Sequence, residues 1–274
     1  MKFALLQMTA GIDPAANAAT IVDAVAEAKA GGASMLFTPE MSNLIDRDRE
    51  RAAASIVGEA AEPVLAAVRA AAKAHGLWVS LGSLAVRQAD GRFANRTFVI
   101  DSAGEISARY DKLHLFDVNV GIGDRWRESA VYAPGQRAVL AQTPLGLMGL
   151  TICYDLRFAA LYHALGAAGA QLLSVPAAFT RPTGEAHWHL LLRARAVETG
   201  CFVIAAAQTG EHEDGRATYG HSLVVDPWGD VLLDMGDAPG LGFAEIEPER
   251  VAEVRARIPV LDHARPIPAV EVAR

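Results

Sequence analysis

Apolar residues along the chain follow two different spacings, and the two kinds of segment alternate over most of its length. Short apolar runs bounded by turn residues are typical of buried β-strands, whereas longer segments with apolar residues three and four positions apart are typical of helices. The sequence therefore predicts helices at residues 14–30, 60–75, 156–168, 184–199 and 248–256. It predicts strands at residues 2–8, 35–37, 77–83, 96–101, 105–112, 137–144, 147–153, 171–177, 201–208, 221–226 and 230–235.

The connections between these predicted strands are of two kinds. Strands alternate with helices in both halves of the chain, which favours parallel pairs, but short glycine-containing turns at 102–104, 145–146 and 227–229 predict antiparallel hairpins. We therefore expect an α/β fold with mixed sheets rather than a purely parallel sheet. Because no linker rich in Pro, Gly or Ser separates the halves, we expect one domain over residues 1–274, with 265–274 as an extended C-terminal tail.

Composition and charge exclude several classes of protein. Of the 274 residues, 51% are hydrophobic and 21% are charged, which is typical of a globular protein. The formal net charge is −7 and Lys and Arg are scattered, so the basic stripe that nucleic-acid binding needs is missing. Residues 158–180 carry no formal charge, but they divide into a helix-like and a strand-like half, so we expect buried core and no membrane partner.

The number and spacing of the cysteines indicate the cellular compartment in which the protein folds. The chain holds only Cys153 and Cys201, too few for a disulfide framework and without the CxxC spacing of a metal site. The N-terminus lacks a long apolar run and a small-residue cleavage site. We therefore expect a protein of the reducing cytoplasm, without a metal.

Three residues that could carry chemistry follow predicted strands: Glu40, Lys112 and Cys153. Strand ends are where sites assemble in α/β sheets, so the three could meet. Each alone also has an ordinary structural interpretation. Glu40 and Lys112 could be solvated surface residues, and a free cysteine is more often a small buried hydrophobe than a nucleophile.

Together the three residues form a set that could hydrolyse an amide. A thiolate is a strong nucleophile, and it needs a base or a cation to form at neutral pH. Glu40 could take the thiol proton and return it to the departing amine. The Lys112 ammonium and the backbone N–H of Tyr154 could stabilise the oxyanion, each by roughly 3 kcal/mol if well aligned.

The sequence contexts of these residues resemble a known family. Three segments are similar, in order and spacing, to the Glu-Lys-Cys set of the nitrilase superfamily of carbon–nitrogen hydrolases. They are TPEM around Glu40, YDKLHLFD around Lys112 and GLTICYDLRF around Cys153. Two further segments resemble the Nit branch of this superfamily, namely EAHWHLLLRARAVETGCFVIAAAQTG and RATYGHSLVVDPWGDVL. One departure is Thr38, which precedes Pro39 and Glu40 where the family often has an apolar residue.

This resemblance implies a fold and a mechanism. It implies a four-layer α-β-β-α sandwich that pairs with a second copy, so we expect a homodimer or a higher homo-oligomer. It also implies a cofactor-free amidase that acts on a small-molecule amide through a Cys thioester. By position, Glu128 in RWRES matches a second glutamate of the family's site.

The resemblance also suggests a substrate. The loop at 209–221, with Arg216 in GRATYGHS, is closer to the amidases that act on deaminated glutathione than to the ω-amidases. The expected reaction therefore converts deaminated glutathione to 2-oxoglutarate and cysteinylglycine. The alternative is an ω-amidase that acts on α-ketoglutaramate and related 2-oxo-acid amides.

Three residues are candidates for substrate binding. Arg157, four residues after Cys153, could bind a substrate carboxylate, but a structural salt bridge is nearly as good an interpretation. Phe179 and Thr183 follow the strand at 171–177, where members of the Nit branch line the acyl pocket. Ordinary loop packing is the alternative for both.

Other polar features are expected to be structural. His187 and His189 lie two apart on a predicted helix and should face different ways, so they should not share a metal. The acidic loop at 211–215 is expected to be solvated, and Cys201, which opens an apolar strand, is expected to be core.

Two rival functions remain open on sequence grounds. One is a Cys–His hydrolase that uses Cys153 with His114 or His163, in which replacement of Glu40 by Gln would spare most of the activity. The other is a non-catalytic binding protein that kept the nitrilase fold, and an acyl adduct on Cys153 would exclude it.

Overall fold

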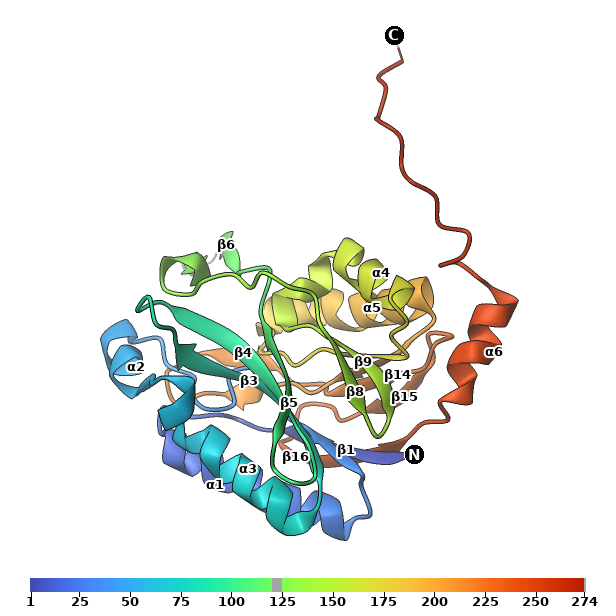
Figure 1. The fold of residues 1–274 in the computed structure, drawn as a ribbon. Coiled ribbons are helices and arrows are strands. Elements are labelled where there is room, and N and C mark those ends of the chain that lie inside the picture. The colour runs from blue at the N-terminus through green and yellow to red at the C-terminus, as the bar shows by residue number, and fades with distance from the viewer. Residues whose placement is uncertain (120–124, 274) are drawn as a thin grey trace.

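A computed structural model describes residues 1–119 and 125–273. Two six-stranded sheets pack face to face, and helices cover the outer face of each, so the layers run helix, sheet, sheet, helix (Figure 1). This is the α-β-β-α sandwich that the sequence motifs imply, and both sheets are mixed as expected. The topology brings the ends of strands from both sheets to one region.

The first sheet is built from the N-terminal half of the chain and one late strand. Its strands lie in the order β16 (Gly240–Glu245), β1 (Lys2–Gln7), β2 (Met35–Phe37), β3 (Trp78–Arg87), β4 (Phe93–Ile100) and β5 (Ile106–Asp111). β1, β2 and β3 are parallel, whereas β16, β4 and β5 pair antiparallel to their neighbours. Helices α1 (Pro14–Ala30) and α3 (Pro63–His75) lie side by side on its outer face (Figure 1).

The second sheet is built from the C-terminal half. Its order is β15 (Val231–Asp234), β14 (Leu223–Val225), β11 (Phe202–Ala205), β10 (Leu172–Ser174), β9 (Gly146–Leu150) and β8 (Leu140–Thr143). The three central strands β9, β10 and β11 are parallel, and the outer ones are antiparallel. Helices α4 (Ala159–Ala167) and α5 (Arg181–Thr199) cover its outer face.

The side chains of β1 show why its sequence is apolar at every position. Phe3 and Leu5 pack in the core between the two sheets, while Ala4 and Leu6 pack against α1 and α3 on the other face. Successive side chains of a strand point to opposite faces, so a strand buried on both sides must be apolar throughout.

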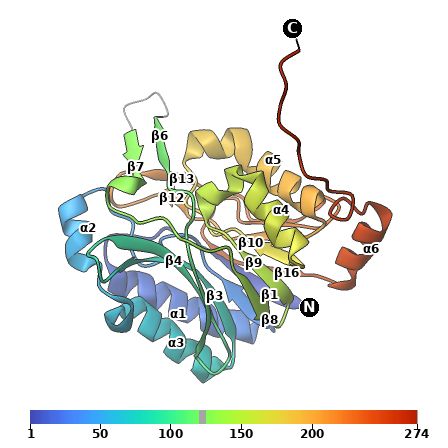
Figure 2. The ribbon, with the colours of Figure 1, turned by 45° about the horizontal axis from the view of Figure 1, so that its top comes forward.

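The remaining elements surround the strand ends and the edge of the molecule. They are α2 (Arg49–Ser55), the hairpin of β6 (Asp117–Asn119) and β7 (Arg125–Arg127), the hairpin of β12 (Thr209–Glu211) and β13 (Ala217–Tyr219), and the 3₁₀ helices η1 (Glu59–Ala61), η2 (Glu128–Ala130) and η3 (Cys153–Arg157). Figure 2 shows the β6–β7 hairpin and α2 at the same end of the molecule. Helix α6 (Glu249–Arg257) precedes a tail that extends away from the body (Figure 1).

The structure confirms the three predicted hairpins, which pair antiparallel as β4–β5, β8–β9 and β14–β15. The helix predicted at 156–168 is wrong in its first part, because Phe158 leaves the helical region (φ −109°, ψ 83°) and separates η3 from α4. The sequence analysis missed β16 and α2. β16 is only partly buried and α2 has no buried residue, so neither carries a strong apolar pattern.

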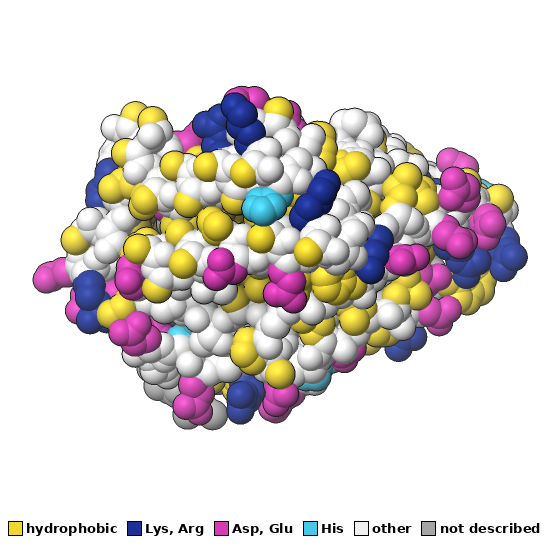
Figure 3. Space-filling view, turned by 90° about the horizontal axis from the view of Figure 1, so that it is seen from below, with side chains coloured by type: hydrophobic (Ala, Val, Ile, Leu, Met, Phe, Trp, Pro, Cys, Tyr) yellow, Lys and Arg dark blue, Asp and Glu magenta, His cyan; other side chains and the backbone are white. Residues whose placement is uncertain are grey.

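Charge on the surface is mixed rather than concentrated. On the face seen from below, Lys and Arg side chains are scattered among Asp and Glu, without a continuous basic patch (Figure 3). Within the described part of the chain, no helix combines the length and the apolar character that a membrane crossing needs.

Candidate active site

The three residues predicted to meet lie at the ends of strands from both sheets. Glu40 follows β2 and Lys112 follows β5 in the first sheet, and Cys153 follows β9 in the second. The segment before Glu40 passes very close to β3. A Cβ atom at Gly82 would lie 1.8 Å from the carbonyl oxygen of Thr38 and 2.6 Å from that of Pro39, so only glycine fits there.

Cys153 sits in an unusual backbone conformation. It is the first residue of η3 and has φ +46°, in the left-handed region that side-chain-bearing residues rarely adopt. Its N–H donates to the Pro176 carbonyl at 2.9 Å. Met41, directly after Glu40, also has a positive φ of 56°. Such conformations store roughly 1–3 kcal/mol and are concentrated at functional sites.

A buried ammonium lies between two carboxylates at the centre of the site. Lys112 Nζ is 2.9 Å from Glu40 Oε1 and 3.0 Å from Glu128 Oε2, and its side chain is 3% exposed. Cys153 lines the same cavity as Glu40, and its thiol lies close enough to the carboxylate for each group to shift the pKa of the other. The structure thus brings together all four residues that the sequence analysis placed in the site. Lys112 occupies the position between the carboxylates that a metal ion would need.

Neutral donors fix both carboxylates in place. The Asn95 side-chain amide donates to Glu40 Oε1 at 2.9 Å and to Glu128 Oε1 at 3.1 Å. The Ala178 N–H donates to Glu40 Oε2 at 2.9 Å, and the Phe116 N–H donates to Glu128 Oε2 at 2.6 Å. Carboxylates held by several donors are pre-oriented.

The electrostatics of the site set its resting protonation. Burial raises the pKa of Glu40, but the charge of Lys112 and hydrogen bonds from Cys153, Lys112 and Asn95 outweigh it, so the pKa lies below its ordinary value. Burial and the Glu40 carboxylate raise the pKa of the Cys153 thiol well above its usual range. Burial opposes the charge on Lys112, yet Glu128 and Glu40 keep its pKa high. The resting site therefore holds a carboxylate, an ammonium and a neutral thiol.

A buried aspartate joins the flank of Lys112 to the flank of Cys153. Asp155 Oδ2 accepts hydrogen bonds from the Tyr110 hydroxyl at 2.7 Å and from the Ile152 N–H at 2.9 Å. Its Oδ1 lies 3.0 Å from the His114 N–H and 2.7 Å from His114 Nδ1. Since the Asp155 side chain is fully buried, these bonds fix the strand of Lys112 relative to η3.

A cavity of about 330 Å³ opens onto these residues. Glu40, Lys112, Glu128 and Cys153 line it, together with the aromatic rings of Phe116, Tyr132, Tyr154 and Phe179. Arginines also line it, namely Arg47, Arg49, Arg127 and Arg216. The cavity can therefore hold a small organic molecule with negatively charged groups.

The predicted substrate-binding residues divide into two groups. Phe179 and Thr183 line the cavity, as does Tyr154, whose N–H lies in the first turn of η3 where no intrahelical partner is available. Arg157 does not line it. Its guanidinium lies 5.5 Å from the centre of the Phe179 ring and 3.3 Å from His187 Nδ1, so it contacts residues around the cavity rather than the cavity itself.

The histidines of the rival mechanism have other surroundings. His114 is bonded to Asp155 and stacks on Phe158 with ring centres 3.6 Å apart, and His163 is exposed on α4. Neither lines the cavity. The geometry thus favours Glu40 over a histidine as the partner of Cys153.

The interpretation of residues 211–215 as a solvated loop is wrong in part. His212 is buried and lies 2.8 Å from both the Ala10 carbonyl and the Thr218 hydroxyl. The Asp214 side chain is 1% exposed and forms an ion pair with Arg216 at 2.8 Å. The loop therefore positions Arg216 at the cavity. Cys201 is fully buried, in agreement with the expectation of a core residue.

Sequence reasoning missed several residues of the site. Asn95 opens a run of three polar residues inside the strand FANRTFVI, and that interruption of the apolar pattern was the available signal. Arg47, Arg49 and Tyr132 reach the cavity from α2 and from loops whose positions no periodicity predicts. Asp155 lies two residues after Cys153 in sequence, but its contacts with Tyr110 and His114 depend on the folded chain.

Comparisons with known proteins agree with this geometry. Residues 2–256 match the carbon-nitrogen hydrolase family. The chain is 41% identical over 269 residues to the deaminated glutathione amidase of Yersinia enterocolitica, covering 96% of this chain and 92% of the relative.

Solved structures are similar as well. The NitFhit protein of C. elegans is 38% identical with a TM-score of 0.89, and the match covers 96% of this chain and 65% of that longer one. An amidase from Nesterenkonia sp. AN1, in a form showing the result of Michael addition of acrylamide at its active site cysteine, is 29% identical with a TM-score of 0.77, over 94% and 98% of the two chains. The chain therefore belongs to the carbon–nitrogen hydrolase family, and it is a hydrolase of carbon–nitrogen bonds other than peptide bonds.

Proposed function

We propose that the protein is an amidase in which Cys153 attacks the carbonyl carbon of a small carboxylate amide and forms a thioester. One observation carries the proposal: Glu40, Lys112 and Cys153 line one cavity, and the buried Lys112 ammonium lies 2.9 Å from the Glu40 carboxylate. This arrangement supplies a nucleophile, a base and an electrophilic cation within one buried cluster.

The first step forms the thioester. As sulfur bonds to the carbonyl carbon, the thiol proton passes to Glu40, since the raised pKa of the thiol prevents earlier ionisation. The Lys112 ammonium and the Tyr154 N–H stabilise the oxyanion. Glu40 then gives its proton to the nitrogen, the carbon–nitrogen bond breaks, and the amine leaves.

The second step regenerates the enzyme. A water molecule takes the place of the amine and attacks the thioester, and Glu40 again accepts a proton. When the tetrahedral intermediate collapses, the carbon–sulfur bond breaks and the proton returns to sulfur. Glu128 holds Lys112 in position through both steps and orients the substrate or the water.

The arginines of the cavity support a substrate with carboxylates on both sides of the amide. Arg47, Arg49 and Arg127 are exposed at the mouth of the cavity, and Arg216 lies deeper, paired with Asp214. Guanidinium groups bind carboxylates well. Deaminated glutathione, which carries one carboxylate at each end, fits this charge, and relatives bear the name deaminated glutathione amidase. The products are 2-oxoglutarate and cysteinylglycine.

A panel of substrates tests the assignment. We expect the highest kcat/KM for deaminated glutathione, a lower value for its neutral C-terminal amide, and lower values again for α-ketoglutaramate and an N-carbamoyl amino acid. Cys153→Ala provides the blank. A higher kcat/KM for α-ketoglutaramate would assign the protein as an ω-amidase instead, and no turnover of any of the four would contradict the proposal.

The homodimer expected from the family resemblance remains a proposal. Exposed apolar side chains on two elements support the homodimer. On α5, Leu190 is 67% and Val197 is 53% exposed, and on β15, Val231 and Leu232 are exposed. The tail carries Ile267, which is 88% exposed, and Val270, which is 90% exposed, away from the body. Sedimentation equilibrium of the full chain and of a chain ending at residue 264 tests whether a dimer forms and whether the tail contributes.

A further inference from the structure

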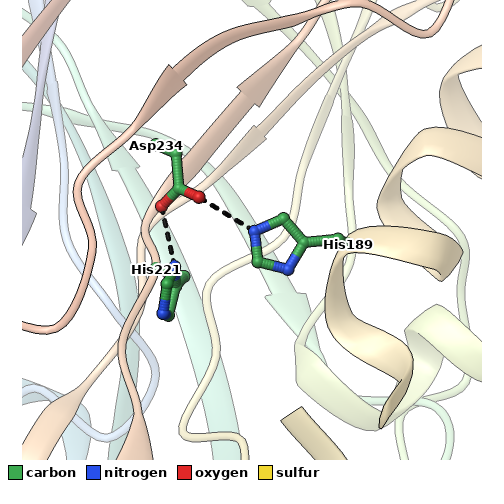
Figure 4. A group of neighbouring side chains, drawn as sticks. All are labelled: His189, His221 and Asp234. Carbon is green, nitrogen blue, oxygen red and sulfur yellow. Dashed lines mark hydrogen bonds and ion pairs between the residues drawn. The ribbon is translucent and has the colours of Figure 1, made fainter. Parts of the chain in front are cut away.

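Two histidines and an aspartate from three different elements converge outside the cavity. His189 lies on α5, His221 lies just before β14, and Asp234 ends β15. Figure 4 shows both imidazole rings directed at the carboxylate between them. His189 Nε2 is 2.9 Å from Asp234 Oδ2, and His221 Nδ1 is 2.9 Å from Asp234 Oδ1. We propose that His189, His221 and Asp234 bind a zinc ion.

The spacing of the three groups is close to that of a zinc site. Zinc bonds to imidazole nitrogen and carboxylate oxygen are about 2.0–2.2 Å long, so neighbouring ligand atoms of a tetrahedral site lie about 3.3 Å apart. Here one ligand atom from each residue lies within 4.8 Å of the other two. Small rotations of these partly exposed side chains would close the remaining gap, and water would supply the fourth ligand.

The donor set selects the class of metal. Two imidazoles and one carboxylate suit zinc and its first-row neighbours, whereas Mg²⁺ and Ca²⁺ prefer sites made only of oxygen atoms. The Gly236 N–H donates to Asp234 Oδ1 at 3.0 Å, which orients the carboxylate toward the two rings. When zinc takes the ring nitrogen that faces Asp234, the imidazole carries its proton on the other nitrogen and stays neutral.

The backbone around the site is held in place before any ion binds. His221 has φ +53°, an uncommon conformation for a residue with a side chain. Its carbonyl accepts a hydrogen bond from Trp188 Nε1 at 2.8 Å, and its N–H donates to the Gly236 carbonyl at 2.6 Å. These bonds tie the segment of His221 to α5 on one side and to the turn after β15 on the other. A bound ion would cross-link α5 to β14 and β15 at this point.

The site is separate from the proposed chemistry. None of its three residues lines the catalytic cavity, and each side chain is 26–34% exposed, so an ion can reach them from solvent. Its role is therefore structural. Binding to the folded state alone should raise the midpoint of thermal unfolding as the zinc concentration rises.

Metal titration of tag-free, EDTA-treated protein tests the proposal. The parent for all titrations carries Cys153→Ala, which removes the thiol of the cavity as a competing ligand. With Co²⁺ as a probe we expect one equivalent to give the visible absorption of a four-coordinate ion, and Zn²⁺ to displace it. Mg²⁺ should have no effect. Titration calorimetry with Zn²⁺ should give a stoichiometry of one ion per chain. Scanning calorimetry should show a higher midpoint of thermal unfolding with Zn²⁺ than without it.

Matched variants locate the ion. Two single variants of the parent, His189→Ala and Asp234→Asn, remove one proposed ligand each. Each should weaken Zn²⁺ binding at least about tenfold and abolish the Co²⁺ spectrum. His163→Ala, which removes an exposed histidine on α4, should bind as the parent does. Absence of the Co²⁺ spectrum in the parent, or equal affinity in His189→Ala and the parent, would overturn the proposal. A folded circular dichroism spectrum in each variant excludes loss of binding through unfolding.

Discussion

Lys112 Nζ lies 2.9 Å from Glu40 Oε1, and both side chains are buried. The cation and the surrounding donors outweigh burial and hold the pKa of Glu40 below its ordinary value of 4.5. Glu40 is therefore still mostly ionised at pH 4.5. We predict that the acid midpoint of kcat/KM for the free enzyme lies below pH 4.5. An acid midpoint above 4.5, at a pH where circular dichroism shows folded protein, would contradict this.

The same pair predicts the effect of acid on stability. A carboxyl whose pKa is lowered by folding contributes stability above its unfolded pKa, and this contribution is lost as the pH falls through the folded pKa. Glu40→Gln should therefore flatten the pH dependence of the unfolding midpoint below pH 4.5. An unchanged acid slope in this variant would show that Glu40 does not carry the effect.

Replacement of Lys112 by Gln should remove the proposed oxyanion donor. We expect kcat to fall by roughly 10²–10³-fold, the range found for loss of one such donor. With Glu128 left unpaired beside Glu40, the acid limb of the pH profile should also move to higher pH. Lys73→Gln, at an exposed position of α3, is the matched control and should behave as wild type. A fall in kcat without a shifted acid limb would argue against the Lys112–Glu40 coupling.

Asp155 is predicted to act as a positioning residue for Lys112 and Cys153. Asp155→Asn leaves one carbonyl oxygen to face donors from Tyr110, His114 and Ile152. We expect a loss of about 1–3 kcal/mol in the free energy of unfolding.

The kinetic readout separates positioning from a purely structural role. At temperatures where Asp155→Asn is fully folded, kcat should fall while KM stays within about twofold. Asp23→Asn, at an exposed position of α1, should change neither quantity. A folded Asp155→Asn enzyme with wild-type kcat would show that the bonds of Asp155 do not position the site.

Gly82 is predicted to be required for the position of Glu40. In Gly82→Ala the new Cβ would overlap the Thr38 carbonyl at 1.8 Å, so the segment leading to Glu40 must move. We expect kcat to fall by roughly 10²-fold, as for other displacements of about 1 Å at an active site. Gly58→Ala is the control, because its nearest atom is 3.8 Å away and its φ is −68°. Equal activity of the two variants would contradict the prediction.

Much of the fold could be predicted from the sequence because its strands are buried on both faces. Two features predicted the mixed sheets. They are the apolar runs of β1, β9 and β11 and the glycine-containing turns of three hairpins. β16 and α2 could not be predicted in this way, since each is partly or wholly exposed and its pairing depends on distant segments. The order of the four layers, helix, sheet, sheet and helix, was predicted from the family resemblance rather than from periodicity.

The site was predictable where residues follow strands and carry distinctive chemistry. Glu40, Lys112 and Cys153 were found in this way, and their convergence is a consequence of the topology. Arg157 shows that closeness in sequence does not place a residue in the cavity, because it lies four residues from Cys153 yet contacts the Phe179 ring without lining the cavity. Contacts between segments far apart in the sequence, such as those of Asn95 with both glutamates, depend on side-chain geometry that no spacing encodes.

The central claim is that Cys153 carries the acyl half of the substrate. Rapid acid quench of the enzyme with deaminated glutathione, followed by intact and peptide mass spectrometry, tests this most directly. We predict a mass increase equal to the 2-oxoglutaryl group on the peptide that contains Cys153, and neither adduct nor cysteinylglycine release with Cys153→Ala. An adduct on another residue, or cysteinylglycine release by Cys153→Ala at the wild-type rate, would contradict the account.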